Sequence, residues 1–185
     1  MKRFTQITLL FALALLVACG GDGADQPAEK AMTARSDDFG SQLATVTDHY
    51  LALKDALVEA DGQSAAGHAT AMRTALAAVN GESLSGDKAG KWTADKATLA
   101  AAIDGVVGAD NVEAMRAAFQ ALSNAMIETA RTYGPAERTL YVQHCPMAFN
   151  NAGADWLSAD KQVVNPYFGD RMLHCGSVTE TIAMK

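Results

Sequence analysis

Proline, positive charge and long apolar runs are scarce over most of this 185-residue chain. Proline is absent between Pro27 and Pro135, and alanine is abundant there, so nothing in that stretch opposes long helices. After Val17, no apolar run is long enough to cross a bilayer. Acidic residues outnumber basic ones by 21 to 15, and an acidic surface argues against partners such as nucleic acid or anionic lipid headgroups.

Sequence patterns typical of enzymes are also missing. The chain has no phosphate-binding loop, no nucleophile elbow and no paired-carboxylate constellation. It also lacks CxxC and CxxCH, and no histidine lies squarely on an apolar helical stripe, which disfavours haem and electron transfer. We therefore expect a binding or interaction protein and not an enzyme.

The N-terminus has the pattern of a bacterial lipoprotein signal. Lys2 and Arg3 precede an apolar run from Ile7 to Val17 that is too short to span a bilayer stably. The run ends in Leu16-Val17-Ala18-Cys19, which matches a lipobox, so we expect residues 1–18 to be removed and Cys19 to carry the lipid. The alternative is an ordinary signal peptide with a chance cysteine. Gly20 favours the outer over the inner membrane, facing the periplasm.

The segment that follows the anchor differs from the rest of the mature chain. Residues 19–38 are rich in small and polar residues without apolar periodicity, which predicts a flexible tether after Cys19. The remaining length suits one domain with its own core. Without Lys2 and Arg3, the mature chain has 13 basic and 21 acidic residues, a net charge near −8.

Apolar residues then recur at helical spacing in residues 39–134. Four stripes are separated by turn residues such as Gly62, Asn80-Gly81 and Gly108, and the last ends at Gly134-Pro135. Since each stripe must pack against others, the pattern predicts an all-α fold, an antiparallel four-helix bundle. The third stripe is weaker, and its helix is predicted to be entered through Trp92, with Thr93 as a cap. The stripes consist of Phe39, Leu43, Val46, Tyr50, Leu53 and Leu57; Ala65, Ala69, Met72, Leu76 and Val79; Leu99, Ile103 and Val106; and Val112, Met115, Phe119, Leu122, Met126 and Tyr133.

Residues 135–185 have a different character and are expected to form a small loop-and-strand lobe of the same domain. Residues 138–143 suit a short strand, and the sequence around Asn150, Asn165-Pro166 and Gly176 is typical of loops. Both cysteines that remain after Cys19 lie in this lobe, so chemistry is to be sought here.

Each of these two cysteines has a methionine and a histidine close by. Cys145 and Met147 are two apart, which puts both on one side of an extended segment. Met172 and Cys175 are three apart, which puts both on one face of a helical turn. If the segments meet, two thiolates and two thioethers converge, and such soft ligands select Cu(I) or Ag(I). His144 and His174 are secondary candidates as ligands.

Other interpretations of these residues remain open. By spacing alone, an even pair of cysteines in an exported protein favours a disulfide. Zinc could also use two cysteines and two histidines, although adjacent His-Cys pairs are awkward for one tetrahedral centre. Met72, Met115 and Met126 lie on the apolar stripes and are expected to be core. His49 and His68 are expected to be surface or hydrogen-bonded histidines on helices.

The order of short motifs in the lobe resembles a bacterial domain of unknown function. The motifs are Cys145-Pro146-Met147, Gly153-Ala154-Asp155-Trp156-Leu157-Ser158, Asn165-Pro166-Tyr167-Phe168-Gly169 and Met172-Leu173-His174-Cys175-Gly176, and the resemblance covers nearly all of residues 39–182. That domain occurs in exported lipoproteins and fused to periplasmic adaptor subunits of copper/silver efflux systems. The resemblance implies heavy-metal handling, most plausibly copper, with Cys145, Met147, Met172 and Cys175 as ligands.

These observations predict a lipid-anchored periplasmic protein that sequesters or transfers Cu(I), or Ag(I), outside the cytoplasm. Trp156 and Tyr167 are candidates for shielding the site from water, or are simply core. A partner from metal efflux or copper delivery is expected. The alternative is an interaction module with a permanent Cys145–Cys175 disulfide and no metal.

Overall fold

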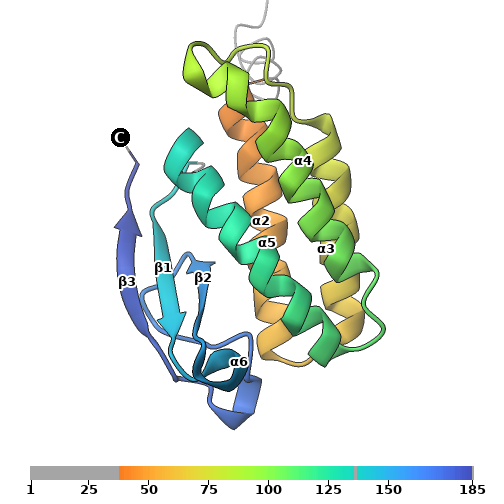
Figure 1. Cartoon of the computed structure of the whole chain (residues 1–185), viewed down its shortest axis with the longest axis vertical. Helices are drawn as coiled ribbons and strands as arrows, with labels where there is room; N and C mark the ends of the chain where they lie inside the picture. Colours follow the sequence, from red (N-terminus) through yellow and green to blue (C-terminus); the bar gives the residue numbers. More distant parts are fainter. Residues whose placement is uncertain (1–37, 136, 185) are drawn as a thin grey trace, which may run out of the picture.

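The structure, a computed structural model, describes residues 38–135 and 137–184. Its first part consists of four long helices: α2 (Phe39–Val58), α3 (Gly62–Ala78), α4 (Asp87–Val107) and α5 (Val112–Tyr133). They lie side by side, and consecutive helices run in opposite directions (Figure 1). The described residues are thus mostly helical, as expected. The signal peptide, Cys19 and the predicted tether up to residue 37 lie outside the described residues.

The predicted apolar stripes form the core between these helices. Nearly all their members are buried, including Met72, Met115 and Met126, so the prediction that these methionines pack in the core is confirmed. Val112 and Tyr133, at the two ends of the last stripe, are only partly buried and pack against the core. Two charged residues that the periodicity did not mark, Lys54 and Arg116, are buried as well.

The prediction for the start of the third helix was wrong. Helix α4 begins at Asp87, so Thr93 lies inside the helix and is not its cap. Residues 87–91 are exposed, which explains why this turn has no apolar periodicity. Asp87 in the first turn favours a helix start there through its charge. None of the helices in the described part of the chain is long and apolar enough to cross a membrane.

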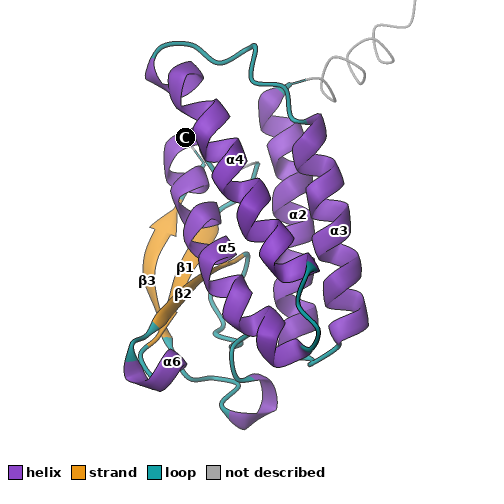
Figure 2. Ribbon diagram, turned by 45° about the vertical axis from the view of Figure 1, so that its right-hand side comes forward, coloured by secondary structure: helices purple, strands orange, loops and turns teal. Residues whose placement is uncertain are grey.

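The C-terminal segment forms a three-stranded antiparallel sheet beside the helices (Figure 2). Strand β1 (Leu140–Cys145) lies in the centre, between β2 (Ala154–Ser158) and β3 (Ser177–Ile182). The sequence predicted only one short strand, over residues 138–143, and β1 is displaced from it by two residues. It reaches Cys145 because Cys145 pairs with Ala154 of β2. The short elements α6 (Ala148–Asn151) and η1 (Gly169–Arg171) complete the lobe.

Two polar side chains of the helices hold the lobe in place. The hydroxyl of Tyr50 lies 2.8 Å from the hydroxyl of Ser123 and accepts a hydrogen bond from the backbone N–H of Leu157 at 3.0 Å, which joins α2, α5 and β2. The buried guanidinium of Arg116 donates to the carbonyl oxygens of Leu57 and Pro166. The loop that carries the second cysteine is therefore fixed to the helices by a hydrogen-bonded charge.

Candidate functional site

The structure brings the two cysteines of the lobe into direct contact. Both are free thiols, and the Sγ of Cys145 lies 2.8 Å from the Sγ of Cys175. Cys145 ends the central strand and is fully buried, whereas Cys175 lies in irregular chain before β3 and is partly exposed. One thiol thus belongs to the rigid sheet and the other to a segment outside regular secondary structure.

Strand register explains why these two residues meet. His144 pairs with Ser177, so the chain just before Ser177 runs beside the end of β1. Gly176 makes this approach possible, with a φ of +139°. A Cβ at this position would lie 2.6 Å from the carbonyl oxygen of His144 and 3.2 Å from the ring of Trp156. Only glycine fits both the backbone conformation and the space.

The contact with Cys145 changes the acidity of Cys175, the partly exposed thiol. The hydrogen bond with Cys145 raises the pKa of Cys175 above that of an ordinary thiol, and partial burial and the charge of Cys145 act in the same direction. A hydrogen bond from the backbone of Met147 lowers the pKa of Cys175 and opposes the shift in part. Two thiolates in contact repel each other, so a cation between them, or oxidation, relieves a real electrostatic cost.

The two candidate methionines line one cavity of about 480 Å³, and neither cysteine is among its lining residues. Met147, which is 48% exposed, lies immediately before α6, and Met172 immediately after η1. The backbone connects both to Cys175: its thiol contacts the Met147 backbone, and its N–H donates to the carbonyl oxygen of Met172 at 3.0 Å. The backbones of both methionines therefore lie beside Cys175, and both residues line the cavity next to α6.

Asn165 holds the loop that carries Cys175. The sequence predicted a turn at Asn165-Pro166 but did not mark Asn165 itself as a residue of the site. Its side chain is fully buried, donates to the carbonyl oxygen of Cys175 at 2.9 Å and accepts from the backbone N–H of Tyr167 at 2.9 Å. Its own N–H donates to the carbonyl oxygen of Leu173. The signal that could have found it is the Asn-Pro pair, since an asparagine that bonds to the backbone two residues later forms an Asx turn.

Aromatic side chains cover the inner side of this loop. Trp156 is fully buried and Tyr167 is 5% exposed, with ring centres 5.9 Å apart in an edge-on arrangement. The hydroxyl of Tyr167 donates to the carbonyl oxygen of Asp155 at 2.7 Å. Burial and the negative charge of neighbouring groups hold the pKa of Tyr167 well above its ordinary value. Both rings are thus core residues that also close the lobe against water behind the thiols.

The turn between Met147 and β2 has an unusual backbone. Phe149, Asn150 and Asn151 all have positive φ, at 51°, 57° and 68°, so most of α6 is left-handed. Asparagine tolerates this region, but for phenylalanine it costs on the order of 1–3 kcal/mol. All three residues line the same cavity as Met147. Local strain of this kind concentrates at functional sites, and here it lies beside the candidate thioether.

The structure does not bring the two histidines of the lobe into the sulfur group. The imidazole of His144 is bonded through Nδ1 to Asp155 at 2.8 Å, on the face of the sheet opposite to Cys145. The side chain of His174 is exposed, and its Nδ1 donates a hydrogen bond to the carbonyl oxygen of Val163 at 2.8 Å. Each Nδ1 is held in the way that orients a metal-binding imidazole, but its partner is Asp155 or Val163 and not a sulfur residue.

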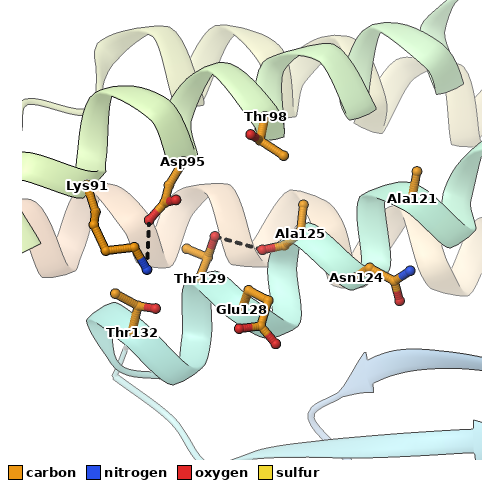
Figure 3. Close-up of a pocket in the computed structure, with 9 residues that line it drawn as sticks. All are labelled: Lys91, Asp95, Thr98, Ala121, Asn124, Ala125, Glu128, Thr129 and Thr132. Atoms are coloured by element: carbon orange, nitrogen blue, oxygen red, sulfur yellow. Dashed lines mark hydrogen bonds and ion pairs between the residues drawn. The ribbon is translucent and has the colours of Figure 1, made fainter.

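Other possible sites in the described chain are few. Residues 38–135 and 137–184 contain no group of three or more histidine, cysteine, aspartate or glutamate side chains placed to hold a metal ion. A second cavity, of about 510 Å³, lies between α4 and α5 (Figure 3). It is lined by polar and small side chains, with an ion pair of 3.9 Å between Lys91 and Asp95, and contains no sulfur. Of the two cavities, only the one beside α6 has soft donors.

The helical part of the chain matches a known family model. The family model described as "Protein of unknown function (DUF3347)" matches residues 46–138, half of the chain. The match runs from α2 to the residues just before β1, so the expected resemblance to a domain of unknown function is confirmed for the helices, whereas the cysteines and methionines of the lobe lie outside it. No curated protein and no solved structure matches the chain.

Proposed function

The chain belongs to the DUF3347 family of proteins of unknown function, and from that premise we propose that it binds Cu(I) or Ag(I) outside the cytoplasm, for sequestration or transfer. The observation that carries the proposal is the contact between the two thiols, whose sulfurs lie 2.8 Å apart. The backbones of Met147 and Met172 both contact Cys175, and the two methionines line one common cavity. Thiolates supply the negative charge for the ion, and thioethers complete a soft ligand shell without adding charge.

Ion binding requires the two thiols to separate. Two sulfurs that share an ion at about 2.3 Å each lie roughly 3.8–4.6 Å apart, depending on the angle at the ion. The sulfurs are 2.8 Å apart without an ion, so a shift of about 1–2 Å is needed. We assign this movement to Cys175, because Cys145 is buried in the central strand while Cys175 lies in irregular chain. An ion bound at the accessible side of the lobe can also leave, which suits a carrier.

The helices serve, in this proposal, as the scaffold of the site. We infer that α2–α5 pack as an antiparallel four-helix bundle, since neighbouring helices contact one another and their apolar stripes form one core. The protein is a binding protein, not an enzyme. A lipid on Cys19 holds it at the periplasmic face of a membrane, the outer membrane in preference to the inner. It passes the ion to, or receives it from, a metal-efflux or copper-delivery protein. If Cys19 is the anchor, Cys19→Ala will move the protein from the membrane to the soluble fraction.

The test is an anaerobic titration of the reduced protein with Cu(I) against a chromophoric chelator of known affinity. We expect a single ion with a Kd of about 1 nM or below, since two charged donors and two neutral ones act together. The double variant Met147→Leu/Met172→Leu keeps side-chain size and should weaken binding by about tenfold or more. Cys145→Ser/Cys175→Ser should abolish it.

The matched control is Met184→Leu, which replaces another exposed methionine, 59% exposed, outside the site. It should leave the affinity unchanged. Micromolar binding by the unmodified protein, or an affinity indifferent to loss of both site methionines, contradicts the proposal.

The thiol contact also favours a second function, that of an interaction module stabilised by a disulfide. Two free thiols 2.8 Å apart need little movement to form a bond, and the compartment expected from the N-terminus permits disulfides. Alkylation of the protein directly in the cell envelope, followed by mass spectrometry, separates the two functions. Cys145 and Cys175 alkylated or metal-bound support the carrier, and a pair that resists mild thiol reduction supports the module.

A further inference from the structure

Two histidines on the helices, His49 and His68, lie close to each other. His49 of α2 and His68 of α3 have ring centres 6.4 Å apart, with ring planes inclined by 37°. Both side chains are half-buried. Within residues 38–135 and 137–184, neither imidazole forms a hydrogen bond or ion pair, unlike those of His144 and His174. The expectation that they would be hydrogen-bonded or simple surface residues accounts for neither the pairing nor the free ring nitrogens.

The fold places both histidines at the rim of the same helix–helix contact. His49 precedes Tyr50, and His68 precedes Ala69, and both of these following residues are fully buried. Helices α2 and α3 are consecutive and pack closely against each other. Each histidine therefore lies one position before a residue of the buried stripe. Its side chain lies at the edge of the helix–helix interface, where water and ions have access.

We propose that His49 and His68 together bind a divalent transition-metal ion, Cu²⁺ or Zn²⁺, with water as the remaining ligands. Neutral imidazole nitrogen is a preferred donor for both ions. An ion at about 2.0–2.1 Å from one nitrogen of each ring lies roughly 3.2 Å from each ring centre, so two rings that share it can be at most about 6.4 Å apart. The observed separation is at this limit, and a small rotation of either side chain closes it to the roughly 5.2 Å of a tetrahedral angle.

This site is distinct from the sulfur site in place and in chemistry. Helix α3 lies on the side of the helices away from the sheet (Figure 1). The sulfur group offers soft donors that suit Cu(I), whereas the histidine pair offers borderline donors that suit divalent ions. The surface between α2 and α3 therefore extends the binding range of the protein to a second oxidation state of copper, or to zinc, whether or not the lobe binds Cu(I).

The experiment is a Cu²⁺ titration of the tag-free protein after oxidation of the Cys145–Cys175 pair, so that thiols neither compete nor reduce the ion. Electron paramagnetic resonance should show nitrogen ligands, and Zn²⁺ should raise the melting temperature. In His49→Ala and in His68→Ala we expect the affinity to fall by about tenfold or more, because each loses one of two protein donors. Gln63→Ala, an exposed position of the same helix α3, is the matched control and should change nothing.

The stoichiometry separates a shared ion from two independent histidines. If one ion is shared, the unmodified protein binds one Cu²⁺ at the pair, each single variant binds it more weakly, and His49→Ala/His68→Ala binds none there. Circular dichroism checks that the half-buried substitutions leave the helices intact. Unchanged affinity in the single variants, two ions bound independently at the two histidines, or a spectrum without imidazole nitrogen would each overturn the proposal.

Discussion

Asn165→Ala tests whether one buried side chain holds the second cysteine in place. The amide of Asn165 bridges two backbone groups, the carbonyl oxygen of Cys175 and the N–H of Tyr167. Alanine removes both bonds and leaves the surroundings otherwise intact. If the loop depends on this side chain, the substitution must reduce stability and also weaken Cu(I) binding, since it frees the segment that positions a thiol.

The structure sets the expected magnitude. The N–H of Tyr167 is buried and has no access to water, so leaving it unpaired costs about 1–3 kcal/mol. The carbonyl of Cys175 belongs to a partly exposed residue and can take a water molecule instead, so its loss is about 1 kcal/mol. Together the free energy of unfolding should fall by roughly 2–4 kcal/mol, a large share of the stability of a domain of this size.

Urea unfolding monitored by tryptophan fluorescence measures this loss, because Trp156 reports on the lobe and Trp92 on the helices. Asn165→Asp keeps the acceptor for Tyr167 but buries a carboxylate against the carbonyl oxygen of Cys175, so at neutral pH it should lose at least as much stability as Asn165→Ala. Asn124→Ala, at an exposed position of α5, is the control and should change stability by less than about 0.5 kcal/mol. If Asn165→Ala behaves like this control, the loop does not depend on the Asn165 bridge.

Three further substitutions test other parts of the site. Gly176→Ala should destabilise the protein by about 2 kcal/mol or more, because the new Cβ would lie 2.6 Å from a backbone oxygen at a residue with positive φ. The control is Gly90→Ala, in open space on α4, which should stabilise the protein by about 0.5–1 kcal/mol. Thermal melts compare the two variants. Tyr50→Phe should cost about 1–3 kcal/mol in urea unfolding, since it deprives two buried groups of their partner; an unchanged midpoint would refute the bridge between helices and sheet. Cys145→Ala removes the main cause of the raised pKa of Cys175, so the pKa of Cys175 should fall. The pH midpoint of iodoacetamide alkylation at Cys175 should then move down. A midpoint that stays or rises contradicts the contact between the two thiols.

The helices were the most predictable part of the fold. Apolar residues at helical spacing identify the buried face without knowledge of any partner, because a helix presents the same face to whatever core it meets. The start of α4 at Asp87 was missed because its first turn is exposed and polar and therefore has no stripe. Strands β2 and β3 were also missed. They are short, and their pairing with β1 depends on residues far along the chain.

The candidate site was predictable only in its composition. Soft donors in loop sequence identified the four sulfur residues, and the structure brings the two thiols into contact and the two methionines to one cavity. The positioning role of Asn165 and the buried charge of Arg116 could not be read from spacing, because each depends on which backbone groups the fold leaves without partners. The pairing of His49 with His68 likewise depends on how α2 is set against α3.

The sequence by itself determined the helical content, the buried face of each helix and which residues of the lobe are candidate soft donors. These are local properties of side-chain type and spacing. The tertiary structure alone decided that Cys145 meets Cys175, that Met147 and Met172 share a cavity, and that His144 and His174 point elsewhere. Each of these depends on strand register, on one glycine that admits close approach and on hydrogen bonds between distant segments, and a shift of one residue in register would reverse which side chains face one another.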